Sequence, residues 1–184
     1  YPCSLDFHIH GDVFCKLRCE DTYWEDDAFN RLLPRLAEYR FPENVWMAHG
    51  TSRLLTQDPF AETCDQVRIH LITAKRYLKG ALYLWSPKTA GRKITGQPEE
   101  DGIFFDVPLS GRDRNLFAFK FLRENGEFEP DMANRLWSSA DGKEIWTHSE
   151  SPHISSSKPV RKMLTVHYQT TFPAMQYLRL WQSN

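Results

Sequence analysis

QVRIHLIT, residues 66–73, decides the fold class of this chain, because its buried-type residues recur at every second position. Val67, Ile69 and Leu71 fall on one side of the segment. Arg68, His70 and Ile72 fall on the other. A period of two is that of a strand with one face on a core. The segment therefore predicts a β-strand rather than a helix.

Other short apolar runs in the chain predict further strands, separated by 9 Gly and 11 Pro that are scattered singly. We expect 86–102 to be a polar loop and 26–40 to be the one place where helical spacing competes, although Pro34 would interrupt a helix there. Short strands at this spacing predict an all-β fold of two antiparallel, immunoglobulin-like β-sandwich modules. The predicted strands are GALYLW (80–85), IFFDVPL (103–109), LFAFKFL (116–122) and DGKEIW (141–146).

A repeat relates the first third of the chain to its middle. CKLRCEDTYWEDDAFNRL (15–32) aligns without a gap with FKFLRENGEFEPDMANRL (119–136), 104 residues later. Downstream, ENVWMAHG (43–50) aligns with KEIWTHSE (143–150). Charged and amide residues are among the identities, which shared strand propensity does not explain. The identical pairs are Lys16 and Lys120, Glu20 and Glu124, Glu25 and Glu129, Asp27 and Asp131, Asn30 and Asn134, Arg31 and Arg135, and Leu32 and Leu136.

A second repeated pair marks the opening of a module. VRIHL (67–71) resembles LTVHY (164–168), and LYLW (82–85) resembles LRLW (178–181). We therefore expect one complete module over 65–157. The two ends of the chain, 1–60 and 161–184, are expected to form a second, composite module, within one chain or by exchange between chains.

Composition excludes several partners. The chain has 23 basic and 24 acidic residues in 184, a net charge of −1, and no long apolar run. We expect no nucleic-acid partner and no membrane partner, because neither a basic surface nor a membrane span is indicated. Aromatic residues make up 14% of the chain. Some of them are expected to face outward.

No cofactor or metal is expected. Cys3, Cys15, Cys19 and Cys64 have no paired spacing typical of zinc, so free thiols, disulfides and a metal site stay open in that order of preference. His8-Ile9-His10 has the spacing of two metal ligands on one strand face, but this signal is weak alone.

LYLW suggests a binding surface. If its leucines face the core, Tyr83 and Trp85 lie two residues apart on the opposite face of the strand. Flat aromatic rings suit the C–H faces of sugars, whose hydroxyls then need polar groups at the ring edges. The structural alternative is that one of the two rings packs under a loop or against the second module.

FEPDMANRLW (128–137) supplies such polar groups. Phe128 is a third aromatic residue, and Asp131 is expected to bind hydroxyls. Asn134 and Arg135 are expected to brace the loop, and an Asp131–Arg135 pair is the structural alternative.

Taken together, VRIHL, LYLW, the FEPD and NRLW segments, and DGKEIW resemble the family 41 carbohydrate-binding modules, the α-glucan-binding modules at the N-terminus of pullulanases. The resemblance covers 67–146 and, through the repeat, 5–46 and 164–181. It implies a non-catalytic β-sandwich that binds starch, glycogen, pullulan or maltooligosaccharides. It also implies attachment to a larger multidomain protein and favours a secreted or cell-surface location.

Carried over by position, the resemblance assigns two sugar sites. In the middle module it implies stacking by Tyr83 and Trp85 and a polar contact from Asp131. In the composite module the residues carried over are Arg179, Trp181 and Asp27, and the internal repeat adds Trp24 as the counterpart of Phe128. The chain departs from the family pattern because Arg179 is not aromatic and because no lysine directly precedes either aspartate.

Two other functional classes were weighed. Carboxylate pairs such as Glu99 and Glu100 suggest a glycosidase, but hydrolysis needs two carboxyl groups held across a cleft, and a small sandwich offers none. We therefore expect no enzymatic activity. The alternative to glucan binding is a structural or protein-interaction sandwich whose exposed aromatic residues dock a partner domain.

Overall fold

The computed structural model describes residues 12–19, 23–26, 29–34, 36, 41–73, 77–86 and 89–160. Their regular structure is β-strand with short 3₁₀ helices, among them Gly111–Arg114, Asp131–Ala133 and Ser139–Asp141, and the described residues form no α-helix. The β-rich fold class is therefore confirmed for this part of the chain. None of the helical turns in it has the length or apolar run of a membrane span.

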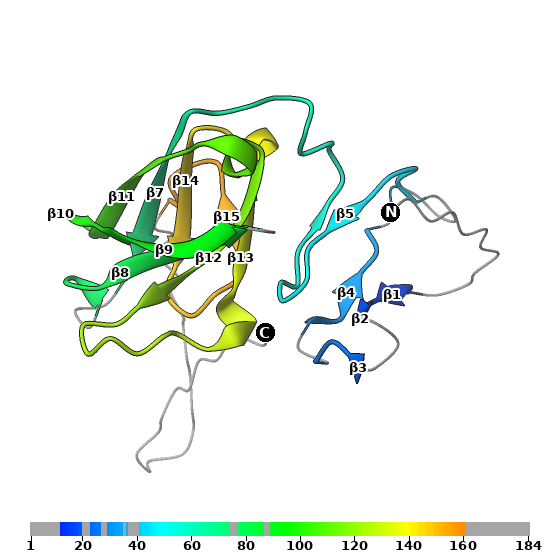
Figure 1. The fold of residues 1–184 in the computed structure, drawn as a ribbon, viewed down its shortest axis with the longest axis horizontal. Helices are drawn as coiled ribbons and strands as arrows, with labels where there is room; N and C mark the ends of the chain where they lie inside the picture. The colour runs from blue at the N-terminus through cyan, green and yellow to red at the C-terminus, as the bar shows by residue number, and fades with distance from the viewer. Residues whose placement is uncertain are drawn as a thin grey trace, which may run out of the picture.

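Two sheets form the main body of the molecule (Figure 1). The order of the first is β10-β11-β7-β14-β15, and that of the second is β13-β12-β8-β9. The strands of the first sheet are β7 (Gln66–Ile72), β10 (Gln97–Glu99), β11 (Gly102–Pro108), β14 (Glu144–His148) and β15 (Ile154–Ser155). Those of the second are β8 (Ala81–Ser86), β9 (Thr89–Thr95), β12 (Leu116–Leu122) and β13 (Arg135–Ser138).

The core lies between these sheets, because alternate residues of each strand face inward. Val67, Ile69 and Leu71 are fully buried, as the alternation in 66–73 predicts. The ring of Phe105 on β11 lies 5.5 Å from that of Phe121 on β12, which joins the two layers. The residues between the two sheets form one hydrophobic cluster, which runs along the sequence from Cys64 to Ile154.

One strand pair corrects the expectation of a purely antiparallel sandwich. β14 runs parallel to β7, with Ile145 opposite Ile69. The chain runs from β11 in the first sheet to β12 and β13 in the second. It then returns to the first sheet as β14, which lies beside β7 and runs in the same direction. A parallel neighbour is allowed here because the connection crosses between layers.

The prediction that 86–102 forms a loop is wrong. It contains β9 and β10, and β9 pairs with β8 along most of its length. β9 is an edge strand with only Ile94 packed against the main core. Such a strand has polar residues on most positions, so its sequence has no apolar alternation to reveal it.

The described part of residues 12–60, which we call the first segment, forms three two-stranded pairs. β4 lies in the stretch where a helix was the alternative, so a continuous helix over 26–40 is wrong. β1 pairs with β4, β2 with β3, and β5 with β6. Their bounds are β1 (Phe14–Cys15), β2 (Arg18–Cys19), β3 (Tyr23–Trp24), β4 (Arg31–Leu32), β5 (Trp46–Met47) and β6 (Leu54–Leu55).

A buried ion pair fixes the turn between β12 and β13. Glu129 accepts hydrogen bonds from both terminal nitrogens of Arg135 and from the backbone N–H groups of Phe121 and Glu150, the last two at 2.9 Å. Arg135 also donates to the carbonyl of His148 at 2.7 Å. Both side chains have no solvent exposure. Burial lowers the pKa of Arg135, and the charge of Glu129 opposes that effect.

The same arrangement recurs in the first segment. Glu25 accepts hydrogen bonds from Arg31 and from the backbone N–H groups of Leu17 and Gly50, and Arg31 donates to the carbonyl of Ala48. Desolvation favours a raised pKa for Glu25, but the hydrogen bonds from these donors hold that pKa below its ordinary value. Every partner occupies the position that the sequence alignment matches to the Glu129 network.

Strand register follows the same correspondence. β1 pairs with β4 as β12 pairs with β13, 104 residues later. β5 pairs with β6 as β14 pairs with β15, 100 residues later. Gly50 and Glu150, also 100 residues apart, both have a left-handed backbone with φ of 73° and 61°. The described residues of 12–55 that take part in these pairings therefore have the local geometry of their counterparts in 116–155.

Candidate functional site

Tyr83 and Trp85 lie on the outer face of the four-stranded sheet. Their neighbours Leu82 and Leu84 are buried in the core, while both aromatic side chains are only half-buried. A strand alternates its side chains between faces, so this burial pattern places both rings on one surface. The sequence-based prediction of their facing is confirmed.

Three aromatic rings gather on this face. The ring centroid of Tyr83 lies 5.8 Å from that of Trp85, with an angle of 32° between the ring planes. Phe128 approaches Tyr83 at 5.4 Å in an edge-on arrangement of 68°. Phe128 is 42% exposed and reaches this position because its backbone bridges to Leu122 at the end of β12. We call Tyr83, Trp85 and Phe128 the aromatic platform.

An ion pair borders the aromatic platform. Lys120 Nζ lies 2.7 Å from Asp131 Oδ1, 4.5 Å from the centroid of Phe128 and 6.0 Å from that of Trp85. The Lys120 side chain is 14% exposed, whereas that of Asp131 is 74% exposed. A carboxylate and an ammonium group therefore stand at the edge of exposed rings, where both acceptors and donors are available.

The sequence did not predict Lys120 as a site residue, because the family pattern has its lysine directly before the aspartate and Lys120 lies eleven residues before Asp131. β12 supplies it instead, directly opposite Tyr83 in the strand pairing. Its facing was available from LFAFKFL, where Phe119 and Phe121 alternate with Lys120 and occupy the core. The signal was strand alternation rather than a local motif.

Asn134 and Arg135 lie away from the aromatic platform. Arg135 is buried with Glu129, so the alternative pair between Asp131 and Arg135 does not form. Asn134 Nδ2 donates to the carbonyl of Gly50 at 2.9 Å. These two side chains hold the backbone around the loop.

The residues assigned to a second site are only partly described. Trp24 is on β3, where its side chain is 56% exposed and the guanidinium of Arg18 lies 5.6 Å from its ring centroid. Figure 1 places β3 well apart from β8. Asp27, Arg179 and Trp181 lie outside the described residues, as do His8, His10 and the C-terminal part of the expected composite module.

The first segment closes one side of the aromatic platform. Leu55 of β6 forms a small apolar cluster with Ala118 and Leu136, against which Trp46 and Trp85 both pack. The structural alternative, in which Trp85 packs against neighbouring structure, therefore applies to one part of its ring. The remaining part stays accessible, because Trp85 is not fully buried.

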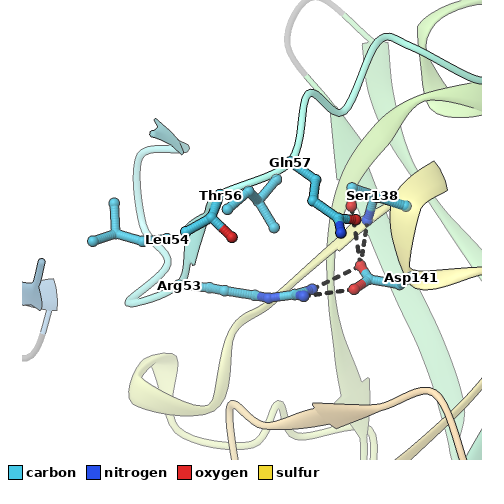
Figure 2. Close-up of a pocket in the computed structure, with 8 residues that line it drawn as sticks. Arg53, Leu54, Thr56, Gln57, Ser138 and Asp141 are labelled. Atoms are coloured by element: carbon cyan, nitrogen blue, oxygen red, sulfur yellow. Dashed lines mark hydrogen bonds and ion pairs between the residues drawn. The ribbon is translucent and has the colours of Figure 1, made fainter. Parts of the chain in front are cut away.

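Polar contacts fix this junction. Arg53 makes two hydrogen bonds to the carboxylate of Asp141, at 2.7 and 2.5 Å (Figure 2). It makes another to the carbonyl of Leu136 at 2.6 Å. Ser139 adds a hydrogen bond to the carbonyl of Pro59. The shallow pocket at this point has no aromatic residue in its lining and is crossed by the ion pair, so it is not the candidate site.

The opposite sheet carries a different cluster. His70 stacks on Trp146 at 4.8 Å and lies between the carboxylates of Glu99 and Glu144, each about 3 Å from a ring nitrogen. The imidazole is thus engaged on both nitrogens and on one face.

Metal-binding geometry is not found in the described residues, where no three His, Cys, Asp or Glu side chains are arranged to hold an ion. Cys15 and Cys64 are free thiols, and burial raises the pKa of Cys15. Neither thiol belongs to the aromatic platform.

No protein-family model matches the sequence, and no curated protein matches it. Two solved structures are similar to part of the chain. One, described as "Alpha-glucan recognition by family 41 carbohydrate-binding modules from streptococcal virulence factors", is 19% identical with a TM-score of 0.40 and is matched over 54% of this chain and 50% of its own. The other, "Alpha-glucan binding by a streptococcal virulence factor", is 19% identical with a TM-score of 0.38, over 56% and 51%. The chain thus spans about half the length of each.

Proposed function

We propose that the aromatic platform binds α-glucan chains without catalysis, as part of a larger protein that it brings to starch, glycogen or a related polysaccharide. Tyr83 and Trp85 stack on successive glucose rings, and Phe128 flanks them. Lys120 and Asp131 bind hydroxyl groups at the edge. The chain's net charge of −1 is close to zero, which suits an uncharged ligand.

The observation that carries this proposal is the tilt of 32° between the rings of Tyr83 and Trp85. Successive residues of an α-1,4-glucan turn relative to one another, because the axial linkage curves the chain. A flat β-1,4-glucan ribbon instead fits coplanar rings. Two tilted aromatic faces 5.8 Å apart therefore favour the curved polymer.

Lys120→Met should weaken binding of maltoheptaose by about 1.5 kcal/mol, roughly tenfold, because a charged donor to a sugar hydroxyl is lost while the apolar stem remains. Isothermal titration calorimetry measures the change. Lys143→Met is the matched control, since Lys143 is exposed and lies directly before β14 of the opposite sheet. Equal affinities for the wild type and Lys120→Met would remove Lys120 from the site.

We also propose that 65–157 forms one module and that 1–60 and 161–184 together form a second. The support is the matched geometry of the described part of 12–55 and its counterparts in 116–155, including two buried Glu–Arg pairs with corresponding backbone donors. A segment with this geometry needs the partner strands that VRIHL and LYLW supply in the middle module. LTVHY and LRLW are the sequences in the chain that match them. Two sites would raise avidity for a polysaccharide.

Limited proteolysis tests this organisation. We expect residues 1–60 to be cleaved at least several times faster in a chain ending at residue 160 than in the whole chain, because local opening governs cleavage. Cleavage within 65–157 serves as the internal control. Identical cleavage of 1–60 in both chains would contradict the composite module.

A further inference from the structure

The aromatic platform rests on a strand whose role in the site no motif indicates. Gly91 on β9 lies directly beside the ring of Tyr83. A Cβ atom built on Gly91 falls 1.9 Å from the Tyr83 hydroxyl oxygen and 2.3 Å from its Cζ. Both distances are far below any van der Waals contact. The tyrosine ring therefore lies over the backbone of Gly91 in space that only a glycine leaves free.

A β-bulge places Gly91 at this point. Leu84 pairs with Arg92 and Ser86 pairs with Thr89, so three residue steps on β9 match two on β8. Ala90 and Gly91 together therefore stand opposite Trp85. A bulge bends the strand that carries it and redirects nearby side chains, and bulges are common beside functional sites.

The contact with Gly91 determines which surface of the Tyr83 ring faces the solvent. A ring that lies down on a neighbouring strand has one face against backbone and presents the other outward, whereas an upright ring presents only its edge. Sugar stacking requires an exposed ring face. Any side chain at position 91 must displace the Tyr83 ring, and the tilt between Tyr83 and Trp85 changes with it.

We propose that Gly91 is a positioning residue for the α-glucan site, which it serves by letting Tyr83 lie flat on the β9 bulge. The proposal rests on the proposed glucan-binding function and deepens it. Gly91 itself has no side chain to touch the ligand. It acts through the orientation of Tyr83, so its effect exists only when Tyr83 is present.

A double-mutant cycle tests this dependence in the whole chain. Gly91→Ala and Tyr83→Ala should each weaken maltoheptaose binding about tenfold, and the double variant should bind no more weakly than Tyr83→Ala alone. Thermal melts confirm that each variant is folded. Additive losses would overturn the proposal, because Gly91→Ala would then act independently of the tyrosine. Unchanged affinity in Gly91→Ala would overturn it as well.

A measurement without ligand separates this proposal from the function on which it rests. In a protein labelled with isotopic glycine, the α-proton resonances of Gly91 should be shifted upfield by the ring current of Tyr83, and Tyr83→Leu should abolish that shift. Resonances unaffected by Tyr83→Leu would overturn the contact. If the wild type fails to bind maltoheptaose while the ring-current shift is present, the glucan proposal fails and the positioning of Tyr83 by Gly91 stands.

Discussion

Arg135→Met should lower the free energy of unfolding by about 3–5 kcal/mol, because it leaves a buried carboxylate without its cation. Glu129 and Arg135 have no solvent exposure, and water cannot replace the lost partner. The remaining donors to Glu129, the backbone N–H groups of Phe121 and Glu150, do not neutralise its charge. Urea denaturation followed by tryptophan fluorescence measures the loss.

The control is an ion pair of the same type on the surface. Arg68 and Asp106 form two hydrogen bonds, but their side chains are 44% and 32% exposed. Arg68→Met should therefore cost no more than about 1 kcal/mol. A similar loss of unfolding free energy for Arg68→Met and Arg135→Met would contradict the view that burial makes the Glu129–Arg135 pair important for stability.

Trp85→Ala should weaken binding of maltoheptaose by about 1–3 kcal/mol, roughly fivefold to 150-fold, because a central aromatic contact surface is removed. Part of the Trp85 ring packs against the cluster of Leu55, Ala118 and Leu136. A modest loss of stability is therefore expected as well, and a thermal melt must accompany the titration.

Trp146→Ala is the matched control for that substitution. Trp146 is also half-buried, but it lies on the outer face of the opposite sheet and stacks on His70. Its removal should reduce stability and leave affinity for maltoheptaose unchanged. A folded Trp85→Ala variant that binds like the wild type would exclude Trp85 from the site.

The sequence predicted those parts of the fold in which burial imposes a period of two. β7, β8, β11 and β12 each place alternate residues in the core, and all four were expected. β9 was not, because an edge strand whose one apolar contact with the core is the partly buried Ile94 has no such period. The parallel pairing of β7 with β14 was also not predicted, because strand alternation carries no information on strand direction.

The residues of the candidate site were predictable from the sequence where strand alternation places them on one face, and not elsewhere. Tyr83 and Trp85 followed from the alternation in LYLW. Lys120 and Asp131 meet across eleven positions of sequence, so a search for adjacent residues did not find them. The contact of Gly91 with Tyr83 depends on a bulge between two strands, which sequence alone does not locate.

The repeat illustrates how sequence and structure complement each other. In the sequence, Glu25 and Arg31 align with Glu129 and Arg135 as identical residues, and only Arg135 was expected to brace a loop. In the structure both pairs do the same thing, because each glutamate accepts hydrogen bonds from its arginine and from two backbone N–H groups. The central claim concerns the aromatic platform, however, and it does not depend on the repeat.

Isothermal titration of the whole chain with maltoheptaose, beside a parallel titration with cellohexaose, tests that claim most directly. We predict saturable heat with the α-linked oligosaccharide and none with the β-linked one, because the rings of Tyr83 and Trp85 are tilted rather than coplanar. No heat with maltoheptaose, together with no retardation in starch or glycogen affinity gels, would contradict glucan binding and favour a surface that docks another protein.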